Sequence, residues 1–183
     1  TDLIIGSNGT LDLQATQTFA TLNLAGTITR TANTSALTIT GTSNIAGSIT
    51  TSGTQTYTGA VTITGGRTLT TCYRNVDFDA TVNAAILGDS LIIAAGSGNV
   101  SFDQAVGGTT ALGNLNITTG ALTAGAIKAQ GTLTVTNSKT SSITGVISEQ
   151  AALALTKAGV GSLTLSGNNT YTGLTTITNG TLK

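Results

Sequence analysis

Asp79 and Asp103 are the residues whose type and spacing could do chemistry. Each ends the pattern Asn-Val-x-Phe-Asp, which begins at Asn75 and again at Asn99. If the two segments lie one above the other, the carboxylates are about 5 Å apart, and they repel unless they are protonated or bridged by a cation. Calcium, which binds carboxylate and carbonyl oxygens, is the candidate ion. The chain has no EF-hand loop or glycine-aspartate nonapeptide, so two solvated aspartates are the simpler interpretation.

Residues for catalysis are scarce. The chain has no His and no Trp, and Glu149 is its only Glu. Glycoside hydrolysis needs paired carboxylates, which only scattered aspartates could supply. No nucleophile elbow, metal-ligand cluster or phosphate-binding loop occurs. We therefore predict that the chain is not an enzyme and needs no cofactor, with a polysaccharide-active enzyme as an alternative.

A further chemical candidate is the stretch Cys72, Tyr73 and Arg74. In the aligned segment these residues stand where Gly-Ser-Gly occupies positions 96–98. The single cysteine excludes an internal disulfide. A bulky, cationic, thiol-bearing turn suggests a contact point or an intermolecular disulfide, although drift in a tolerant loop is the more common explanation.

Short alternating tracts such as LTIT, VTIT and LTVT must position these residues. Each places apolar residues on one face and Thr, Ser or Asn on the other. Threonine favours strands because its branched Cβ restricts χ1. Only 8% of the residues are charged, so few stretches suit a surface helix. The chain is predicted to be all-β.

A repeat indicates how the strands are arranged. Residues 75–96 align with residues 99–120 at a spacing of 24, and a period of this length is typical of stacked architectures. We predict a β-solenoid in which each coil is one repeat, in preference to a β-sandwich. Three pairs of identical residues are expected to stack: Asn75 on Asn99 at a turn, and Val76 on Val100 and Phe78 on Phe102 in the core.

The prediction for residues 1–183 is a single continuous domain of roughly seven or eight coils, each of about 20–24 residues. No composition shift or proline-rich linker divides it. Neither end carries an evident polar cap, so the chain is expected to be an excerpt of a longer repetitive protein, with adjoining repeats or copies of itself stacked end to end. A filament subunit is the corresponding alternative function.

Charge excludes some partners. Seven basic groups balance seven acidic ones, whereas phosphate binding needs clustered Lys and Arg. No nucleic-acid partner is expected. No apolar run approaches the roughly 20 residues of a membrane-spanning helix, so no membrane span is expected in this segment.

Threonine also allows a different function. The tracts 38–40, 62–64, 132–134 and 176–178 read Thr-x-Thr and place two hydroxyls outward around one buried residue. A flat hydroxyl array of this kind suits ice binding. The series is broken at residues 86–88, and threonine simply suits an exposed strand face, so ice binding is only an alternative.

The end of the chain supplies the last signal. Residues 157–182 read KAGVGSLTLSGNNTYTG followed by LTTITNGTL, and residues 53–66 repeat part of this as GTQTYTGAVTITGG. The stretch resembles the passenger-associated repeat of bacterial autotransporters (type V secretion passengers), with Leu174 departing from the usual small residue. Residues 75–120 more loosely resemble filamentous-haemagglutinin-like adhesins. Four repeat-motif residues match between the two tracts: Tyr57 and Gly59 with Tyr171 and Gly173.

The resemblance implies a right-handed parallel β-helix, exported across a Gram-negative outer membrane. In this family the repeat is linked to export and folding, so packing beside a glycine turn is the expected role of the motif tyrosine. The sequence therefore predicts a non-catalytic structural or adhesive stalk or fibre segment, extracellular or on the outer cell surface. A host-cell or glycan surface is the expected external partner.

Overall fold

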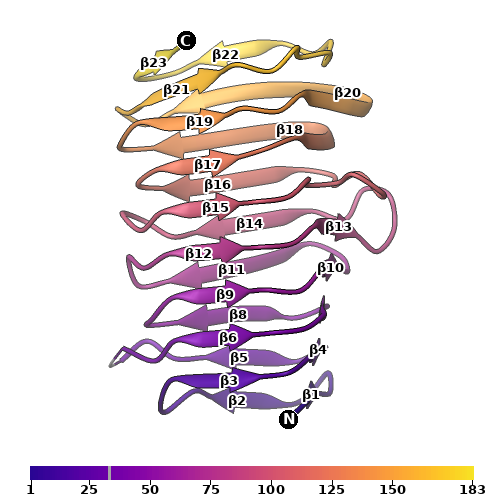
Figure 1. The fold of residues 1–183 in the computed structure, drawn as a ribbon, viewed down its shortest axis with the longest axis vertical. Helices are drawn as coiled ribbons and strands as arrows, with labels where there is room; N and C mark the ends of the chain where they lie inside the picture. The colour runs from indigo at the N-terminus through magenta and orange to yellow at the C-terminus, as the bar shows by residue number, and fades with distance from the viewer. Residues whose placement is uncertain (33) are drawn as a thin grey trace.

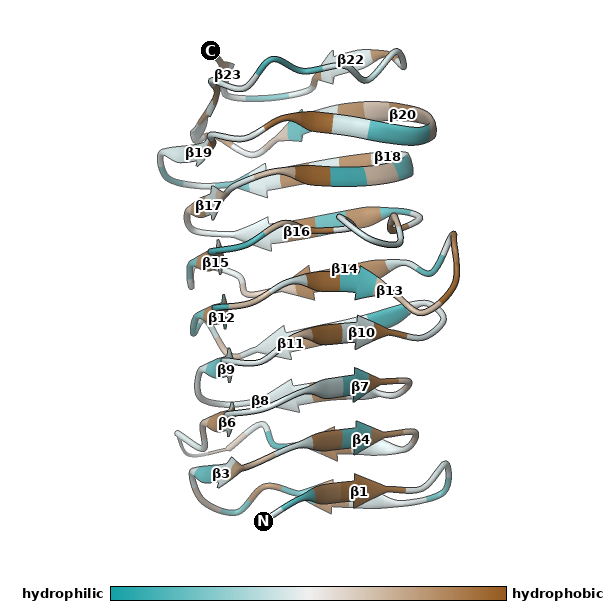
Figure 2. Cartoon of the chain, turned by 45° about the vertical axis from the view of Figure 1, so that its right-hand side comes forward, coloured by the Kyte–Doolittle hydropathy of each residue, from teal (hydrophilic) through white to brown (hydrophobic). Residues whose placement is uncertain are grey.

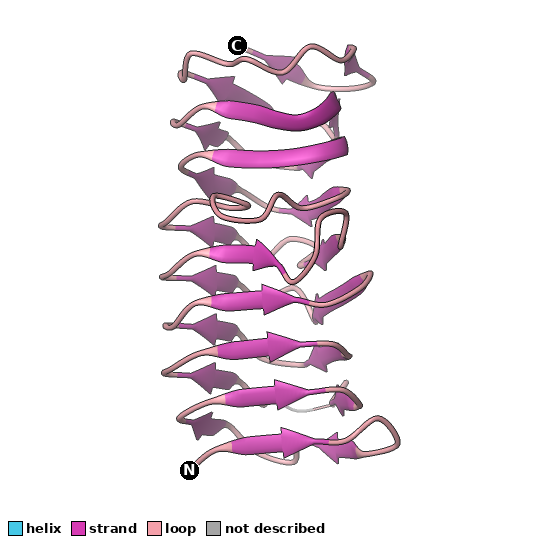
Figure 3. Cartoon of the chain, turned by 90° about the vertical axis from the view of Figure 1, so that its right-hand side faces the viewer, coloured by secondary structure: helices cyan, strands magenta, loops and turns pink. Residues whose placement is uncertain are grey.

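The chain folds as a β-solenoid. We analysed a computed structural model, which describes residues 1–32 and 34–183. All strand pairs in this part of the chain are parallel, and they form three sheets along a rod with the N-terminus at one end and the C-terminus at the other (Figure 1). The described residues contain strands, turns and loops and no helix (Figure 3), and hence no long apolar helix of the kind that crosses a membrane. The predicted all-β solenoid is confirmed.

Each sheet is a ladder of strands in chain order. The first sheet contains β1 (Leu3–Ile5), β4 (Leu22–Leu24), β7 (Ser43–Ile45), β10 (Val61–Ile63) and β13 (Val82–Ala84). The second sheet contains β2 (Thr10–Asp12), β5 (Thr27–Thr29), β8 (Ser48–Thr51), β11 (Arg67–Thr71), β14 (Leu91–Ala94), β16 (Leu115–Thr119), β18 (Ile127–Asn137), β20 (Ile147–Ala158) and β22 (Thr175–Ile177). The third sheet contains β3 (Gln17–Phe19), β6 (Leu37–Ile39), β9 (Gln55–Tyr57), β12 (Val76–Phe78), β15 (Val100–Phe102), β17 (Leu122–Ala124), β19 (Ser141–Ile143), β21 (Ser162–Leu165) and β23 (Thr181–Leu182).

Over residues 1–32 and 34–183 the rod has nine coils, because the second and third sheets each contain nine strands. Seven or eight were expected from a period of 24 residues. That period holds from Leu91 to its partner Leu115, but Ser43 and Val61 are partners only 18 residues apart. The 24-residue coil from Arg67 to its partner Leu91 carries an additional corner loop at residues 85–90. Coil length therefore varies at the corners while the strands keep their register.

Alternation fills the interior with aliphatic side chains. In the second sheet, Ile28, Ile49, Leu69, Ile93 and Ile117 occupy successive register positions, and each is at most 1% exposed. The hydrophobic stretches form vertical stripes along the rod (Figure 2). A single coil could not bury such a stripe, whereas stacked coils share one continuous core.

The close packing of coils at the corner between the first and second sheets requires glycine. A Cβ on Gly26 would lie 2.1 Å from the carbonyl oxygen of Gly9, and one on Gly47 would lie 1.8 Å from that of Gly26. Successive coils therefore touch backbone to backbone here, and no larger residue fits. Beyond β13, β18 and β20 run through this corner as single long strands of 11 and 12 residues.

Candidate functional site

Three aromatic rings form a column inside the third sheet. Tyr57, Phe78 and Phe102 are register partners on β9, β12 and β15, and all three are buried. The ring centroids lie 5.1 Å apart for Tyr57 and Phe78 and 4.9 Å apart for Phe78 and Phe102, with planes 13° and 6° from parallel. Val76 pairs with Val100 in the same strands. The column binds three coils through ring stacking as well as backbone pairing.

The hydroxyl group of Tyr57 has a buried partner. It donates a hydrogen bond of 3.0 Å to Oε1 of Gln55. The amide nitrogen of Gln55 donates in turn to the hydroxyl of Thr51 and to the carbonyl of Thr70, at 3.2 and 2.8 Å. Burial raises the pKa of Tyr57 above its ordinary value. The ring is therefore held as a neutral hydrogen-bond donor within the core.

Asn75 and Asn99 lie at the turns that precede β12 and β15. Oδ1 of Asn75 accepts a hydrogen bond of 2.9 Å from the backbone N–H of Asn99, and Oδ1 of Asn99 accepts one of 3.2 Å from that of Ala121. Each side chain thus bonds to the backbone of the next coil. These bonds join the turns one above another, as the ladder strands do.

A row of buried polar side chains, the corner seam, lines the turn between the second and third sheets. Its members are at most 5% exposed and donate to backbone carbonyls of the turn: Thr51, Thr71, Thr119, Asn137 and Lys157. Turn carbonyls cannot join a strand ladder, so a buried donor avoids the cost of leaving them unpaired. No prediction from the sequence included this row. The available signal was a polar residue at an inward position of the alternation, as in Leu69-Thr70-Thr71.

Lys157 is the charged member of the corner seam. Its side chain is 0% exposed and lies between Val135 and Ile177 in register. Nζ donates to the carbonyls of Ala158, Gly159 (2.9 Å) and Asn179 (3.2 Å). Burial lowers the pKa of Lys157. The ammonium group is thus coordinated by carbonyl dipoles, one of them from the next coil.

Glu149 joins the same two coils through hydrogen bonds at the opposite corner. Its carboxylate accepts hydrogen bonds from the backbone N–H of Leu153 (2.8 Å), and from the N–H (3.0 Å) and hydroxyl (2.7 Å) of Thr172. The hydrogen bonds from Thr172 and Leu153 lower the pKa of Glu149. Together with Lys157, this carboxylate holds the last coil at both ends of β22.

The aspartates lie on the outer side of the third sheet. Asp79 and Asp103 are exposed, at the ends of neighbouring strands. Asp77 is half-buried and accepts a hydrogen bond of 2.9 Å from the hydroxyl of Ser101. Burial raises the pKa of Asp77, and the charges of Asp79 and Asp103 add to this effect. In the described residues no three His, Cys, Asp or Glu side chains gather to hold a metal ion.

The turn at Cys72, Tyr73 and Arg74 exposes its tyrosine side chain to solvent. Tyr73 has a φ of 60°, and it is the one non-glycine residue with positive φ among residues 1–32 and 34–183. The residue is 72% exposed, and its ring lies against Gly96, where an added Cβ would be 2.6 Å from Cδ1. Cys72 is a half-buried free thiol, with Sγ 3.9 Å from the carbonyl of Thr31, and Arg74 is exposed.

The two Thr-Tyr-Thr-Gly tracts occupy different parts of the coil. Tyr57 lies in β9, whereas Tyr171 precedes β22, is partly buried and bonds through its hydroxyl to that of Thr175 at 2.8 Å. The glycines share one role. A Cβ on Gly59 or Gly173 would lie 2.2 or 2.3 Å from a backbone carbonyl of the coil below. The tract therefore provides a close backbone approach in two settings, while its tyrosine packs differently.

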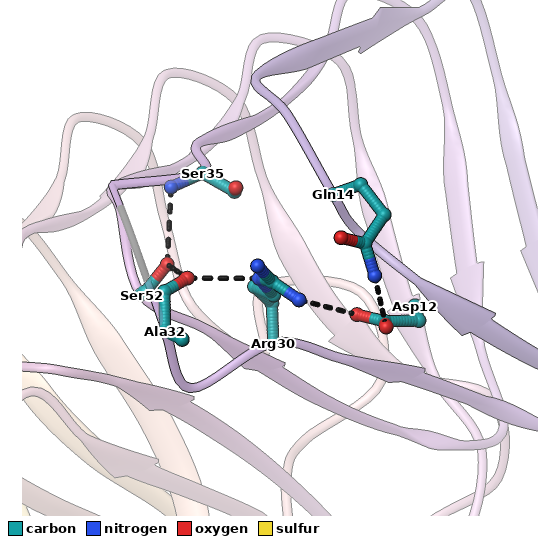
Figure 4. Close-up of polar contacts among 6 residues, drawn as sticks. All are labelled: Asp12, Gln14, Arg30, Ala32, Ser35 and Ser52. Atoms are coloured by element: carbon teal, nitrogen blue, oxygen red, sulfur yellow. Dashed lines mark hydrogen bonds and ion pairs between the residues drawn. The ribbon is translucent and has the colours of Figure 1, made fainter.

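A polar corner near the N-terminus is shown in Figure 4. Arg30 forms an ion pair with Asp12 at 3.3 Å and donates through Nε to the carbonyl of Ala32 at 2.8 Å. The hydroxyl of Ser52 donates to the same carbonyl and accepts from the N–H of Ser35, both at 3.0 Å. These bonds tie the loop after β5 to the neighbouring coils.

The four Thr-x-Thr tracts do not share a face. They fall in β6 of the third sheet, in β10 of the first, and in β18 and β22 of the second. The second sheet nevertheless has its own threonine-rich outer side. Two columns of residues face outward there, with register pairs such as Thr50 with Thr70, Thr118 with Thr136, and Thr134 with Thr156. Ile92 and Ala94 on β14 interrupt both columns.

Comparison with known proteins gives a family match at the end of the chain. Residues 155–183 match the family model of the passenger-associated-transport-repeat. No curated protein and no solved structure matched the chain in the corresponding searches. The matched residues include Lys157, Tyr171 and Gly173, so the prediction made from residues 157–182 is confirmed. The last two coils of this β-solenoid are thus similar to the passenger-associated-transport-repeat of autotransporters.

Proposed function

We propose that this chain is a non-catalytic, rigid segment of an exported autotransporter passenger, which acts as a stalk outside the cell. The observation that carries the proposal is a transport-repeat match at residues 155–183, at the end of an unbroken nine-coil stack. A passenger must extend from the cell surface, and a solenoid supplies length without a larger core. The fold and the repeat suggest a structural rather than a catalytic role.

The stack supports the stalk role mechanically. Eight coil-to-coil steps of about 4.8 Å give a length of about 38 Å. Every step is bridged by parallel strands, and the interior is one cluster of buried aliphatic and aromatic residues. Bending the rod would separate strands on one side, which costs backbone hydrogen bonds.

Immunogold labelling tests the proposal. An antibody raised against this chain is applied to intact cells of the source organism and to permeabilised ones. We expect label on intact cells, at or beyond the outer surface. Label that appears only after permeabilisation would overturn the proposal. The same images distinguish the alternatives, because long fibres with label at regular intervals indicate a filament, and label between bacterium and host cell indicates an adhesin.

A second candidate function is ice binding, which the outer side of the second sheet favours. Thr134, Thr156 and Thr176 follow one another in register on β18, β20 and β22. Neighbouring strands are about 4.8 Å apart and alternate residues about 6.7 Å apart, both near oxygen repeats on ice crystal faces. Thermal hysteresis of the wild-type chain, abolished in Thr134→Arg but retained in Thr164→Arg on the third sheet, would support this function. Absence of hysteresis in the wild type excludes it.

A further inference from the structure

A groove of about 440 Å³ runs along the corner between the second and third sheets, above Tyr73. It crosses four coils and is lined by Gly96, Ser97, Thr118, Thr119, Thr136, Asn137, Ser138, Gly159 and Val160. We propose that this groove binds a neutral oligosaccharide, with the ring of Tyr73 as a platform at one end and Val160 as a hydrophobic contact at the other.

The lining has the chemistry of a neutral ligand. It contains no charged side chain, and it combines glycine backbone and a valine with the hydroxyls of Ser97, Thr118, Thr136 and Ser138. Small-molecule sites usually combine an apolar surface with a few polar groups that fix orientation. A sugar presents the complementary pattern, with C–H faces for the apolar surface and hydroxyls that both donate and accept.

Tyr73 supplies the platform. A bulky residue in the left-handed region is strained, and burial offsets little of that strain for Tyr73, since 72% of its surface is exposed. Glycine would adopt the same φ without strain. An exposed ring that is fixed against Gly96, next to the groove, therefore has a better explanation in binding than in stability. Val160, which is also 72% exposed, lies at the other end of the groove.

The buried side chain of Asn137 lies beneath the groove and has one unpaired acceptor atom. This side chain is 1% exposed and lines the groove. Its Nδ2, which carries two hydrogens, lies within hydrogen-bonding distance of the carbonyls of Lys139 and Ser162 and of the hydroxyl of Ser141. Its Oδ1 accepts no hydrogen bond from any described residue. Buried acceptors are rarely left unpaired, and this oxygen, which has almost no exposed surface, is an unsatisfied polar atom directly beneath the groove.

The size of the groove favours a short chain over a single sugar. Four coils span three strand spacings, or about 14 Å along the rod. A peptide strand would need a free sheet edge for pairing, whereas the strands at this corner are paired on both sides by β14, β16, β18 and β20. The occupant is therefore expected to lie along the rod axis and to bind through side-chain hydroxyls and the ring.

An array of immobilised neutral oligosaccharides, built from glucose, galactose, mannose and N-acetylglucosamine, tests the site. We expect the wild type to bind at least one, with amide shifts at Ser97, Thr118 and Thr136 on titration. Tyr73→Gly should weaken binding about tenfold, since ring contacts contribute about 1.4 kcal/mol. Leu174→Ala, at an exposed and distant position, is the control and should bind as the wild type does.

The melting temperature of Tyr73→Gly distinguishes a binding role of Tyr73 from a structural role. If Tyr73 serves binding, Tyr73→Gly keeps or raises the melting temperature while binding falls. A lower melting temperature together with unchanged binding would overturn the proposal. So would failure of the wild type to bind any neutral oligosaccharide, or binding restricted to charged glycans. Thr118→Arg, which fills the groove, should abolish binding, and wild-type affinity in that variant would also contradict the site.

Discussion

Nζ of Lys157 donates a hydrogen bond of 3.2 Å to the carbonyl oxygen of Asn179, and thereby ties a buried cation to the following coil. The ammonium group has no carboxylate partner among the described residues, and its other bonds go to the carbonyls of Ala158 and Gly159. Removing the cation ends a desolvation cost but leaves these carbonyls without a donor. The second effect should dominate, because the three carbonyls lie at the turns of two adjacent coils, where no strand ladder supplies another donor.

Lys157→Met should therefore lower the free energy of unfolding by about 2 kcal/mol. Chemical denaturation measures the change. Lys139→Met is the matched control, because the Lys139 side chain is exposed and surface substitutions usually change stability by less than about 0.5 kcal/mol. A Lys157→Met variant as stable as the wild type would show that burying the charge costs as much free energy as its hydrogen bonds contribute.

Glu149 should make the last coil sensitive to acid. Its pKa in the folded chain is below the ordinary value of 4.5 because of the bonds from Thr172 and Leu153. The stabilisation is thus fully present above pH 4.5 and is lost as the pH falls through the lowered value. The amide resonance of Thr172, followed by NMR from about pH 6 downward, should report loosening of the coil.

Glu149→Gln should weaken the coil at neutral pH and flatten this acid dependence, since the charge is gone. Asp103→Asn, which removes an exposed carboxylate from a different coil, should leave the Thr172 profile as it is in the wild type. Identical profiles for Glu149→Gln and the wild type would mean that another group controls the acid response.

The aromatic column should carry a large share of local stability. Phe78 is fully buried between Tyr57 and Phe102, so Phe78→Ala should cost about 3–5 kcal/mol in the free energy of unfolding. Phe78→Leu, which fills more of the space, should cost less. Urea denaturation compares the three proteins. A loss below about 1 kcal/mol in Phe78→Ala would indicate that the coils collapse around the cavity.

Asn75 should act through a single acceptor atom. Asn75→Ala removes the acceptor for the N–H of Asn99 and should destabilise the fold by about 1 kcal/mol. Asn75→Asp keeps an oxygen at that position and should retain most of the stability. Equal losses in the two variants would show that the amide, and not its oxygen, is what the turn requires.

Spacing alone predicts much of the architecture. The 24-residue offset between residues 75–96 and 99–120 is the offset of the strand pairs Val76 with Val100 and Leu91 with Leu115. Two identical residues at that offset must stack if the chain forms coils, because parallel strands align equivalent positions. The pattern Lys-x-Gly-x-Gly followed by alternating leucines similarly identifies the last coils.

The length and conformation of the corner loops cannot be predicted from spacing in this way. A coil needs only to return to register, so insertions such as residues 85–90 are tolerated, and no single period gives the coil count. Threonine-rich strands have chemically similar faces, so the sequence does not show that Thr71 and Thr119 point inward as members of the corner seam. The same ambiguity hides the different positions of Tyr57 and Tyr171 within their coils.

In the part of the chain that the structure describes, each coil pairs only with its immediate neighbours. An in-frame duplication of one coil would therefore leave every other contact intact and extend the rod by about 4.8 Å. Unequal recombination between the similar segments at 75–96 and 99–120 is an available route to such a change. The reach of this molecule is consequently a trait that genetic drift and selection can adjust one increment at a time, with no need to evolve a new fold.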